Sequence, residues 1–159
     1  MAATPRILLV VDDDPSIHEL IRAMLAGEAW EINSSENGDE ALSRLATRAY
    51  DLVLTDLLMP SMDGLTLLGQ MRSRYPYTGM LVMTVWNTPA HILGSLEHLA
   101  TAYIAKPFGR EALINTLENA VSTTVNRDDI KILSDQPNLD IAANPLQAHH
   151  RGQGVPVRT

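Results

Sequence analysis

The sequence predicts an α/β fold, in which helices on both faces cover a doubly wound, five-stranded parallel sheet. Two observations support this prediction. Short, continuous apolar runs recur at wide intervals, which is typical of strands that are buried on both faces of a parallel sheet. Segments with helical periodicity separate these runs, so strand and helix alternate five times within about the first 122 residues. This alternation favours a doubly wound sheet whose crossover connections are right-handed.

Five strands are expected, and four of them are evident as apolar runs. These runs cover residues 7–11, 52–55, 80–84 and 103–105. Their continuity, without polar alternation, indicates burial on both faces of the sheet. A weaker strand, second in chain order, fits residues 30–33.

The helices between these strands are marked by capping residues and by apolar spacing. Asp14 is a good N-cap in front of Pro15. Asn37-Gly38 and Asp63-Gly64 are turn signals that open the second and third helices, and a weaker fourth helix is expected at 88–99. The inward face of the first helix is expected to contain Ile17, Leu20, Ile21, Met24 and Leu25, and that of the fourth Leu93, Leu96 and Leu99. The inward face of the last helix is expected to contain Ala112, Leu113, Thr116, Leu117, Ala120 and Val121.

Residues 5–123 are predicted to form one domain, and residues 124–159 a tail or linker. The length of 159 residues suits a single domain. Helical periodicity ends near residue 123, and the remainder contains Pro137, Pro145 and Pro156 with too few apolar residues for a second core.

The composition excludes several classes of function. The chain has no cysteine, so disulfides, thiolate zinc sites and cysteine nucleophiles are excluded. The formal net charge is -7, and residues 1–124 hold fifteen Asp or Glu against eight Lys or Arg. Direct binding to nucleic acid or to an anionic membrane is therefore not expected. Because no apolar stretch is long enough to span a bilayer and no signal-peptide pattern is evident, a cytoplasmic location is expected.

Polar or charged residues follow nearly every predicted strand. Asp12 and Asp13 follow the first strand, and Asp56 ends the third. Thr84 ends the fourth strand, and Lys106 follows the fifth. Ligands of open α/β sheets bind outside the carboxyl ends of the strands, so these side chains are expected to share one site.

The chemistry of this set indicates phosphoryl transfer. Three carboxylates held together repel one another unless a cation is present, and carboxylate oxygens suit Mg²⁺. An amine and a hydroxyl suit phosphoryl oxygens, so the set predicts an acyl phosphate on Asp56 with Mg²⁺, Lys106 and Thr84 around it. Taken singly, the residues have plainer interpretations: a helix cap for the Asp pair, an ordinary strand end for Thr84 and a solvated loop residue for Lys106.

Four segments resemble the receiver domain of two-component response regulators, the single-domain chemotaxis type included. They are residues 7–15 (ILLVVDDDP), 51–64 (DLVLTDLLMPSMDG), 83–84 (MT) and 103–108 (YIAKPF). The resemblance covers residues 5 to about 122. It implies a flavodoxin-like sheet with strand order 2-1-3-4-5, in which Asp12, Asp13 and Asp56 meet across a crevice.

The resemblance implies a role for each site residue. Asp56 matches the phosphoacceptor, which receives its phosphoryl group from a histidine kinase, a phosphotransfer protein or a small acyl phosphate. Asp13 matches the direct Mg²⁺ ligand, with Asp12 acting through water. The backbone carbonyl of Leu58 matches a further metal contact, and Asp56 also faces the metal. Lys106 matches the lysine that pairs with the phosphoryl group, and the peptide bond after it is cis in the family.

Thr84 and Tyr103 match the two switch positions of the family. On phosphorylation the Thr84 hydroxyl would move toward the phosphoryl group, and the Tyr103 ring would move into the vacated space. Plain core packing of Tyr103 is an equal alternative. The switch would alter the surface formed by the last two strands and the last two helices, and this surface would bind a downstream protein partner. A second copy of the chain could instead bind through the fifth strand and the last two helices.

Several positions depart from the family pattern. Val85 stands where the family usually has a small residue. Leu58 and Trp86 occupy the two positions that in the family often carry polar side chains, which orient the hydrolytic water, and both are apolar in this chain. We therefore expect slow self-dephosphorylation and a long-lived signal. Leu99 stands where a glycine commonly precedes the fifth strand, so the shape of that loop is expected to differ.

Two alternatives stay open. A phosphatase of the haloacid dehalogenase type would use Asp12, Asp14, Thr84 and Lys106. That match leaves Asp56 and its surrounding motif unexplained. The chain could also be a fragment of a larger regulator with an output domain. The preferred interpretation is a signalling protein that promotes only its own phosphorylation and dephosphorylation, and so is not an enzyme with an external substrate.

Overall fold

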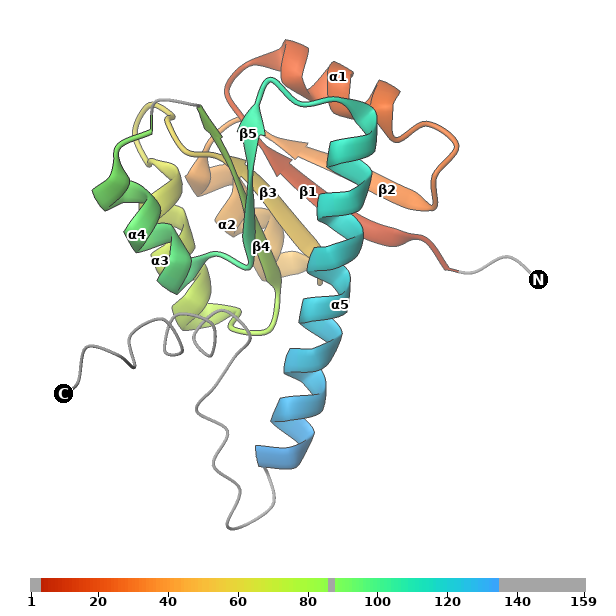
Figure 1. Ribbon diagram of the computed structural model, residues 1–159, viewed down its shortest axis with the longest axis vertical. Helices are drawn as coiled ribbons and strands as arrows, with labels where there is room; N and C mark the ends of the chain where they lie inside the picture. Colours follow the sequence, from red (N-terminus) through yellow and green to blue (C-terminus); the bar gives the residue numbers. More distant parts are fainter. Residues whose placement is uncertain (1–3, 86–87, 135–159) are drawn as a thin grey trace, which may run out of the picture.

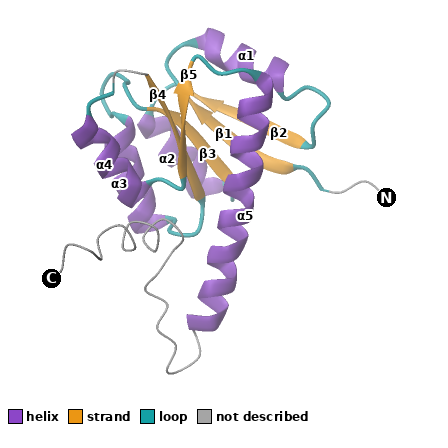
Figure 2. Ribbon diagram, in the orientation of Figure 1, coloured by secondary structure: helices purple, strands orange, loops and turns teal. Residues whose placement is uncertain are grey.

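The computed structural model describes residues 4–85 and 88–134, with side chains described as far as Thr123. Strands and helices alternate throughout this part of the chain (Figures 1 and 2). The strands are β1 (Arg6–Val11), β2 (Trp30–Ser35), β3 (Leu52–Asp56), β4 (Gly79–Val85) and β5 (Ala102–Lys106). The helices are α1 (Pro15–Met24), α2 (Gly38–Thr47), α3 (Gly64–Arg74), α4 (Ala90–Leu99) and α5 (Arg110–Ser134).

The strands form one parallel sheet in the order β2-β1-β3-β4-β5. The predicted fold class and strand order are therefore confirmed. β1 pairs with β3 in a register that places Val11 opposite Thr55. Because these strands are neighbours, Asp12 and Asp56, the residues after Val11 and Thr55, lie side by side at the carboxyl end of the sheet.

Helices cover both faces of the sheet (Figure 2). α1 and α5 pack on one face, and α2, α3 and α4 pack on the other. Leu8 and Val10 of β1 belong to the core under α1 and α5, whereas Leu9 and Val11 belong to the core under the other three helices. Successive side chains of a strand point to opposite faces, so a strand covered on both sides is apolar at every position.

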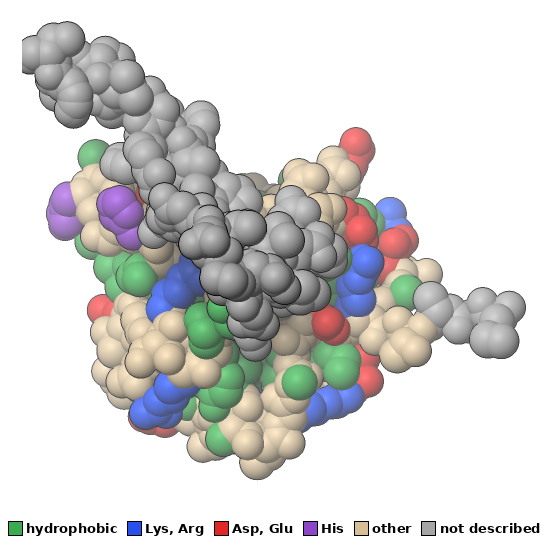
Figure 3. Space-filling view, turned by 90° about the horizontal axis from the view of Figure 1, so that it is seen from below, with side chains coloured by type: hydrophobic (Ala, Val, Ile, Leu, Met, Phe, Trp, Pro, Cys, Tyr) green, Lys and Arg blue, Asp and Glu red, His purple; other side chains and the backbone are tan. Residues whose placement is uncertain are grey.

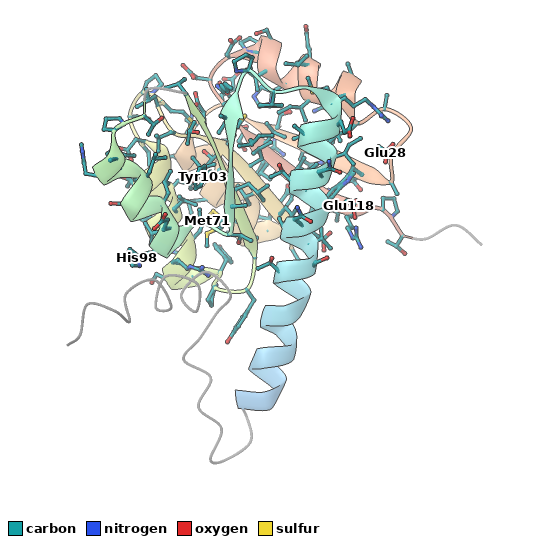
Figure 4. All side chains as sticks on the ribbon, in the orientation of Figure 1. Glu28, Met71, His98, Tyr103 and Glu118 are labelled. Carbon is teal, nitrogen blue, oxygen red and sulfur yellow. The ribbon has the colours of Figure 1, made fainter. Side chains whose placement is uncertain are left out.

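The fifth strand departs from the prediction. Burial of residues 103–105 on both faces is expected from the sequence, but Tyr103 is 45% exposed and Ala105 is also exposed. Only Ile104 of the three is buried in the core. The expectation is wrong because β5 is an edge strand, and the interpretation of Tyr103 as plain core packing is wrong for the same reason (Figure 4).

The predicted N-cap at Asp14 is confirmed, and the two predicted turn signals also open helices, with Asn37 and Asp63 as their N-caps. A side-chain oxygen of Asp14 accepts a hydrogen bond from the Ser16 backbone N–H at 2.9 Å. Asn37 accepts one from the N–H of Glu40, and Asp63 one from the N–H of Thr66, each at 2.8 Å. Each cap satisfies a backbone N–H that has no partner within its helix.

The inward faces of the helices are mostly as expected. Ile21, Leu96, Leu113 and Leu117 are buried, and Leu99 packs against the core. Leu20, however, is 42% exposed. Ala112 is also exposed. Both residues lie at the margin of their apolar stripe, where helical spacing alone does not decide burial.

α5 continues beyond the predicted domain limit at residue 123 and ends at Ser134, projecting past the sheet in Figure 1. Near its start, Arg110 pairs with Glu28 at 2.8 Å, and farther along Glu118 pairs with Arg6 at 3.3 Å (both glutamates are labelled in Figure 4). Among the described residues, each helix is too short or too polar to span a bilayer. The division at residue 123 remains a prediction.

Several charged residues occupy the terminal turns of the helices. Acidic residues occupy the first turns of α2 and α5, at Asp39, Glu40 and Glu111. Arginines occupy the last turns, at Arg22, Arg44, Arg72 and Arg74. This arrangement complements the helix dipoles. Because the helices return against the strand direction, the acidic turns lie at the carboxyl end of the sheet. The face seen in Figure 3 carries basic and acidic side chains next to one another.

Candidate functional site

Three carboxylates meet at the carboxyl end of the sheet, as predicted. Asp12 and Asp13 follow β1, and Asp56 ends β3. One carboxylate oxygen from each lies within 4.8 Å of the others. Asp12 is buried, Asp56 is half-buried and Asp13 is exposed, so the cluster opens to solvent on the side of Asp13.

Lys106 joins this cluster from the end of β5. Its Nζ lies 3.3 Å from Oδ2 of Asp12 and 3.4 Å from Oδ1 of Asp56. The peptide bond after it is cis, in agreement with the family resemblance. A single amine therefore bridges two carboxylates that would otherwise repel each other.

Burial dominates the electrostatics of Asp56. Removal from water raises the pKa of this carboxyl above its ordinary value. The positive charge of Lys106 lowers the pKa, the negative charge of Asp12 raises it, and hydrogen bonds from Lys106 and the backbone of Leu58 lower it. The net direction is upward, so the neutral form of Asp56 is favoured relative to a carboxyl in water.

The loop after Asp56 is held by close backbone contacts. The N–H of Leu57 donates to the carbonyl of Met83 at 3.2 Å, and the N–H of Gly64 donates to the carbonyl of Leu57 at 2.8 Å. A Cβ at position 64 would lie 2.6 Å from the carbonyl oxygen of Asp56. Only glycine allows α3 to begin this close to the end of β3.

The two predicted switch residues occupy different environments. Thr84 is buried near the end of β4, one position after Met83, which pairs in register with Asp56. Tyr103 pairs with Val82 and is exposed on β5. Thr84 thus lies at the level of the carboxylates along the sheet, whereas Tyr103 lies nearer the strand start on an outer surface (Figure 4).

Two apolar residues that follow closely after Asp56 and Thr84 in the chain are exposed. Leu58 is 69% exposed and Val85 is 40% exposed. Both line a cavity of about 440 Å³, together with side chains from α3 and α4. Trp86 lies outside the described residues.

His18 is a site residue that sequence reasoning missed. Its Nε2 lies 2.7 Å from the backbone carbonyl oxygen of Asp12. A helical side chain leans toward the helix N-terminus, so a residue in the first turn of α1 can reach back to the end of β1. In the sequence, this contact is signalled only by the position of His18, six residues after Asp12.

The carboxylate cluster fits a hard divalent cation. Its oxygens converge from three residues, and one of them is accessible to solvent. Mg²⁺ retains several water ligands and uses one or two protein carboxylates, which an open cluster of this kind allows. The donor set contains no soft ligand that would favour a thiophilic metal.

Comparison with known proteins identifies the family. The model of the response regulator receiver domain matches residues 8–118. The chain belongs to this family. Its members are signalling domains of two-component systems, and phosphorylation and Mg²⁺ are general features of them. The match accounts for Asp56 and its motif, which the phosphatase alternative does not.

Individual relatives agree with this assignment. The transcriptional regulator NtrC of Salmonella typhimurium is 36% identical over 116 residues, which are 73% of this chain and 25% of NtrC. The response regulator FleR of Pseudomonas aeruginosa is 34% identical over 108 residues, or 68% of this chain and 23% of FleR. The chain thus spans about a quarter of the length of these curated relatives.

Solved receiver structures share the fold. The chemotaxis response regulator CheY4 of Vibrio cholerae superposes with a TM-score of 0.67 at 28% identity, covering 74% of this chain and 99% of CheY4. The receiver domain of NtrX from Brucella abortus superposes with a TM-score of 0.68 at 29% identity, covering 73% of this chain and 98% of that domain.

Proposed function

We propose that this receiver domain is a phosphorylation-controlled switch whose phosphoacceptor is Asp56. The observation that carries the proposal is the convergence of Asp12, Asp13, Asp56 and Lys106 at one end of the sheet. The donor is the phosphohistidine of a sensor kinase or of a phosphotransfer protein, or a small acyl phosphate. The acidic carboxyl end of the sheet favours a donor whose surface carries positive charge around the histidine.

In the proposed reaction, a carboxylate oxygen of Asp56 attacks the phosphorus atom. The new O–P bond forms as the P–N bond to the donor imidazole breaks, and the imidazole takes a proton from solvent and leaves as the neutral ring. Lys106 lies 3.4 Å from the Asp56 carboxylate and would pair with an oxygen of the incoming phosphoryl group. The buried hydroxyl of Thr84 would then donate to another phosphoryl oxygen.

Mg²⁺ is part of the proposal. Asp13 would hold it directly, Asp12 through water, and Asp56 and the backbone carbonyl of Leu58 would complete the protein contacts. The cation would neutralise negative charge on the phosphoryl oxygens while the phosphoryl group transfers. The exposure of Asp13 supports this assignment, because the accessible carboxylate is the one an incoming hydrated ion meets first.

The output of the switch is proposed to be a change of surface. Movement of Thr84 toward the phosphoryl group would allow the Tyr103 ring, now exposed on β5, to turn inward. The surface of α4, β5 and α5 would then bind a downstream protein or a second copy of the chain. Because the protein modifies only itself, we propose a signalling role without turnover of an external substrate.

Residues outside the receiver fold remain a matter of proposal. The 124–159 segment is proposed to be a tail or linker, and the greater length of the relatives keeps open a larger regulator with an output domain. Direct binding of nucleic acid by this domain and membrane association are not proposed, because the net charge is -7. A cytoplasmic location is part of the same proposal.

Intact-mass analysis after incubation with acetyl phosphate and Mg²⁺ tests the acceptor. The wild-type chain should gain the mass of one phosphoryl group, and the Asp56→Asn variant should gain none. Asp39→Asn, which removes an exposed acid from the first turn of α2, is the matched control and should behave as wild type. An unmodified wild-type chain, or equal modification of Asp56→Asn, would overturn the proposal.

A further inference from the structure

Asp12 is held at every one of its hydrogen-bonding groups. Its backbone N–H donates to the carbonyl of Ser35 at 3.1 Å, and its Oδ1 accepts from the backbone N–H of Asp14 at 2.9 Å. Its Oδ2 accepts from Lys106 at 3.3 Å. The remaining group, its backbone carbonyl oxygen, lies 2.7 Å from Nε2 of His18. One side chain of α1 therefore reaches the main chain of the acidic cluster.

The roles in the His18 contact are fixed by chemistry. A carbonyl oxygen only accepts hydrogen bonds, so Nε2 of His18 must carry the hydrogen. The other ring nitrogen, Nδ1, is buried and has no hydrogen-bond partner within the described part of the chain. The bond to Asp12 is therefore the polar contact that orients this ring.

The contact bears directly on Asp13. The carbonyl of Asp12 and the N–H of Asp13 belong to one planar peptide unit, so a bond that holds the carbonyl also sets the direction in which the chain enters Asp13. Asp13 is the exposed carboxylate of the cluster, whereas the Asp12 side chain is already held by Asp14 and Lys106. The carboxylate with the greatest freedom is thus the one whose backbone His18 restrains.

We propose that His18 is a positioning residue for the divalent cation: its Nε2–H fixes the Asp12–Asp13 peptide and so presents the Asp13 carboxylate to the metal. This proposal rests on the metal site of the proposed function. Loss of the bond leaves Asp13 free to adopt other orientations, and binding of the cation must then restore one of them. Affinity for Mg²⁺ should fall by about five-fold, the equivalent of one net hydrogen bond.

The test is a titration of the full chain with MgCl₂, followed by the amide resonance of Asp13 in ¹H–¹⁵N NMR spectra. His18→Leu removes the donor and should raise the Kd for Mg²⁺ by about five-fold. His18→Gln places an amide N–H at a similar reach and should keep the Kd within about two-fold of wild type. His91→Leu, the same change at an exposed histidine on α4, is the control and should bind as wild type.

Thermal unfolding in EDTA separates a positioning role from a structural one. A structural role would lower the Tm of the apo protein and leave the Kd for Mg²⁺ unchanged. Wild-type affinity in folded His18→Leu, or equal weakening in His18→Leu and His18→Gln, would overturn the inference. If His18→Leu does not fold, His18→Asn, whose amide is too short to reach the carbonyl, takes its place with the same expected loss. A wild-type chain that does not bind Mg²⁺ would instead refute the proposed metal site, and this inference with it.

Discussion

Replacement of Lys106 by methionine tests whether one amine balances the acidic cluster. The substitution keeps an unbranched side chain of similar length but removes the charge that lies 3.3 Å from Asp12 and 3.4 Å from Asp56. The two carboxylates then repel each other without a cation between them. We expect the variant to be less stable than wild type at neutral pH and in the absence of Mg²⁺.

The magnitude follows from distance and exposure. Two unit charges at these separations interact by about 5 kcal/mol at an effective dielectric constant of about 20, and by about 1 kcal/mol in bulk water. Lys106 is 23% exposed and Asp56 is 17% exposed, so water screens the interaction in part. Removal of the amine also abolishes the cost of its own desolvation. The free energy of unfolding at pH 7 should therefore fall by about 2 to 3 kcal/mol.

The pH dependence gives a sharper test. The pKa of Asp56 is raised by burial and lowered by Lys106, so the substitution should raise this pKa further. A raised folded-state pKa means that the folded protein binds the proton more tightly than the unfolded chain does. Stability is then greatest below the ordinary value of 3.8 and falls as pH rises through the raised folded value. The deficit of Lys106→Met should accordingly be small near pH 4 and largest near neutrality.

Urea denaturation in EDTA at the two pH values measures these differences. Arg110→Met is the control, because Arg110 pairs with Glu28 at the surface and its loss should cost about 1 kcal/mol or less. Added Mg²⁺ should stabilise Lys106→Met more than wild type, since the cation supplies the missing positive charge. A deficit that does not change between acid and neutral pH, or that does not exceed that of the control, would refute the reasoning.

Two further predictions concern the surroundings of Asp56. Gly64→Ala would place a methyl group 2.6 Å from the carbonyl oxygen of Asp56. The substitution should lower the free energy of unfolding by about 2 to 3 kcal/mol and slow phosphorylation by acetyl phosphate. Gly69→Ala, the control, has open space around the added methyl group and should be neutral or stabilising. Equal behaviour of the two glycine variants in urea would contradict this. The apolar, exposed Leu58 should leave the hydrolytic water unoriented, so the phosphoryl group should persist for longer than a minute after donor removal, and Leu58→Asn should shorten its lifetime several-fold. A wild-type lifetime of seconds to a minute, followed by intact mass, would exclude slow self-dephosphorylation.

Local patterns predicted the elements of this fold well. The caps at Asp14, Asn37 and Asp63 depend only on a side chain and a backbone N–H two or three residues away, so the sequence contains the whole interaction. The buried strands β1, β3 and β4 are likewise evident, because a strand covered on both faces must be apolar at each position. Local patterns do not contain the exposure of Tyr103 and Leu20, since it depends on which strand lies at the edge of the sheet and on what covers one margin of α1.

The sequence by itself determined which chemical groups end the strands, and the family motif indicated that their strands are neighbours. Only the tertiary structure decided that one amine, Lys106, contacts both Asp12 and Asp56, and that His18 holds the carbonyl between the first two carboxylates. Residue types and spacing act along the chain, whereas these contacts join residues brought together by strand order and register. The strength of a charge interaction depends on separations of a few ångströms and on exclusion of water, and both arise only when the strands and helices pack.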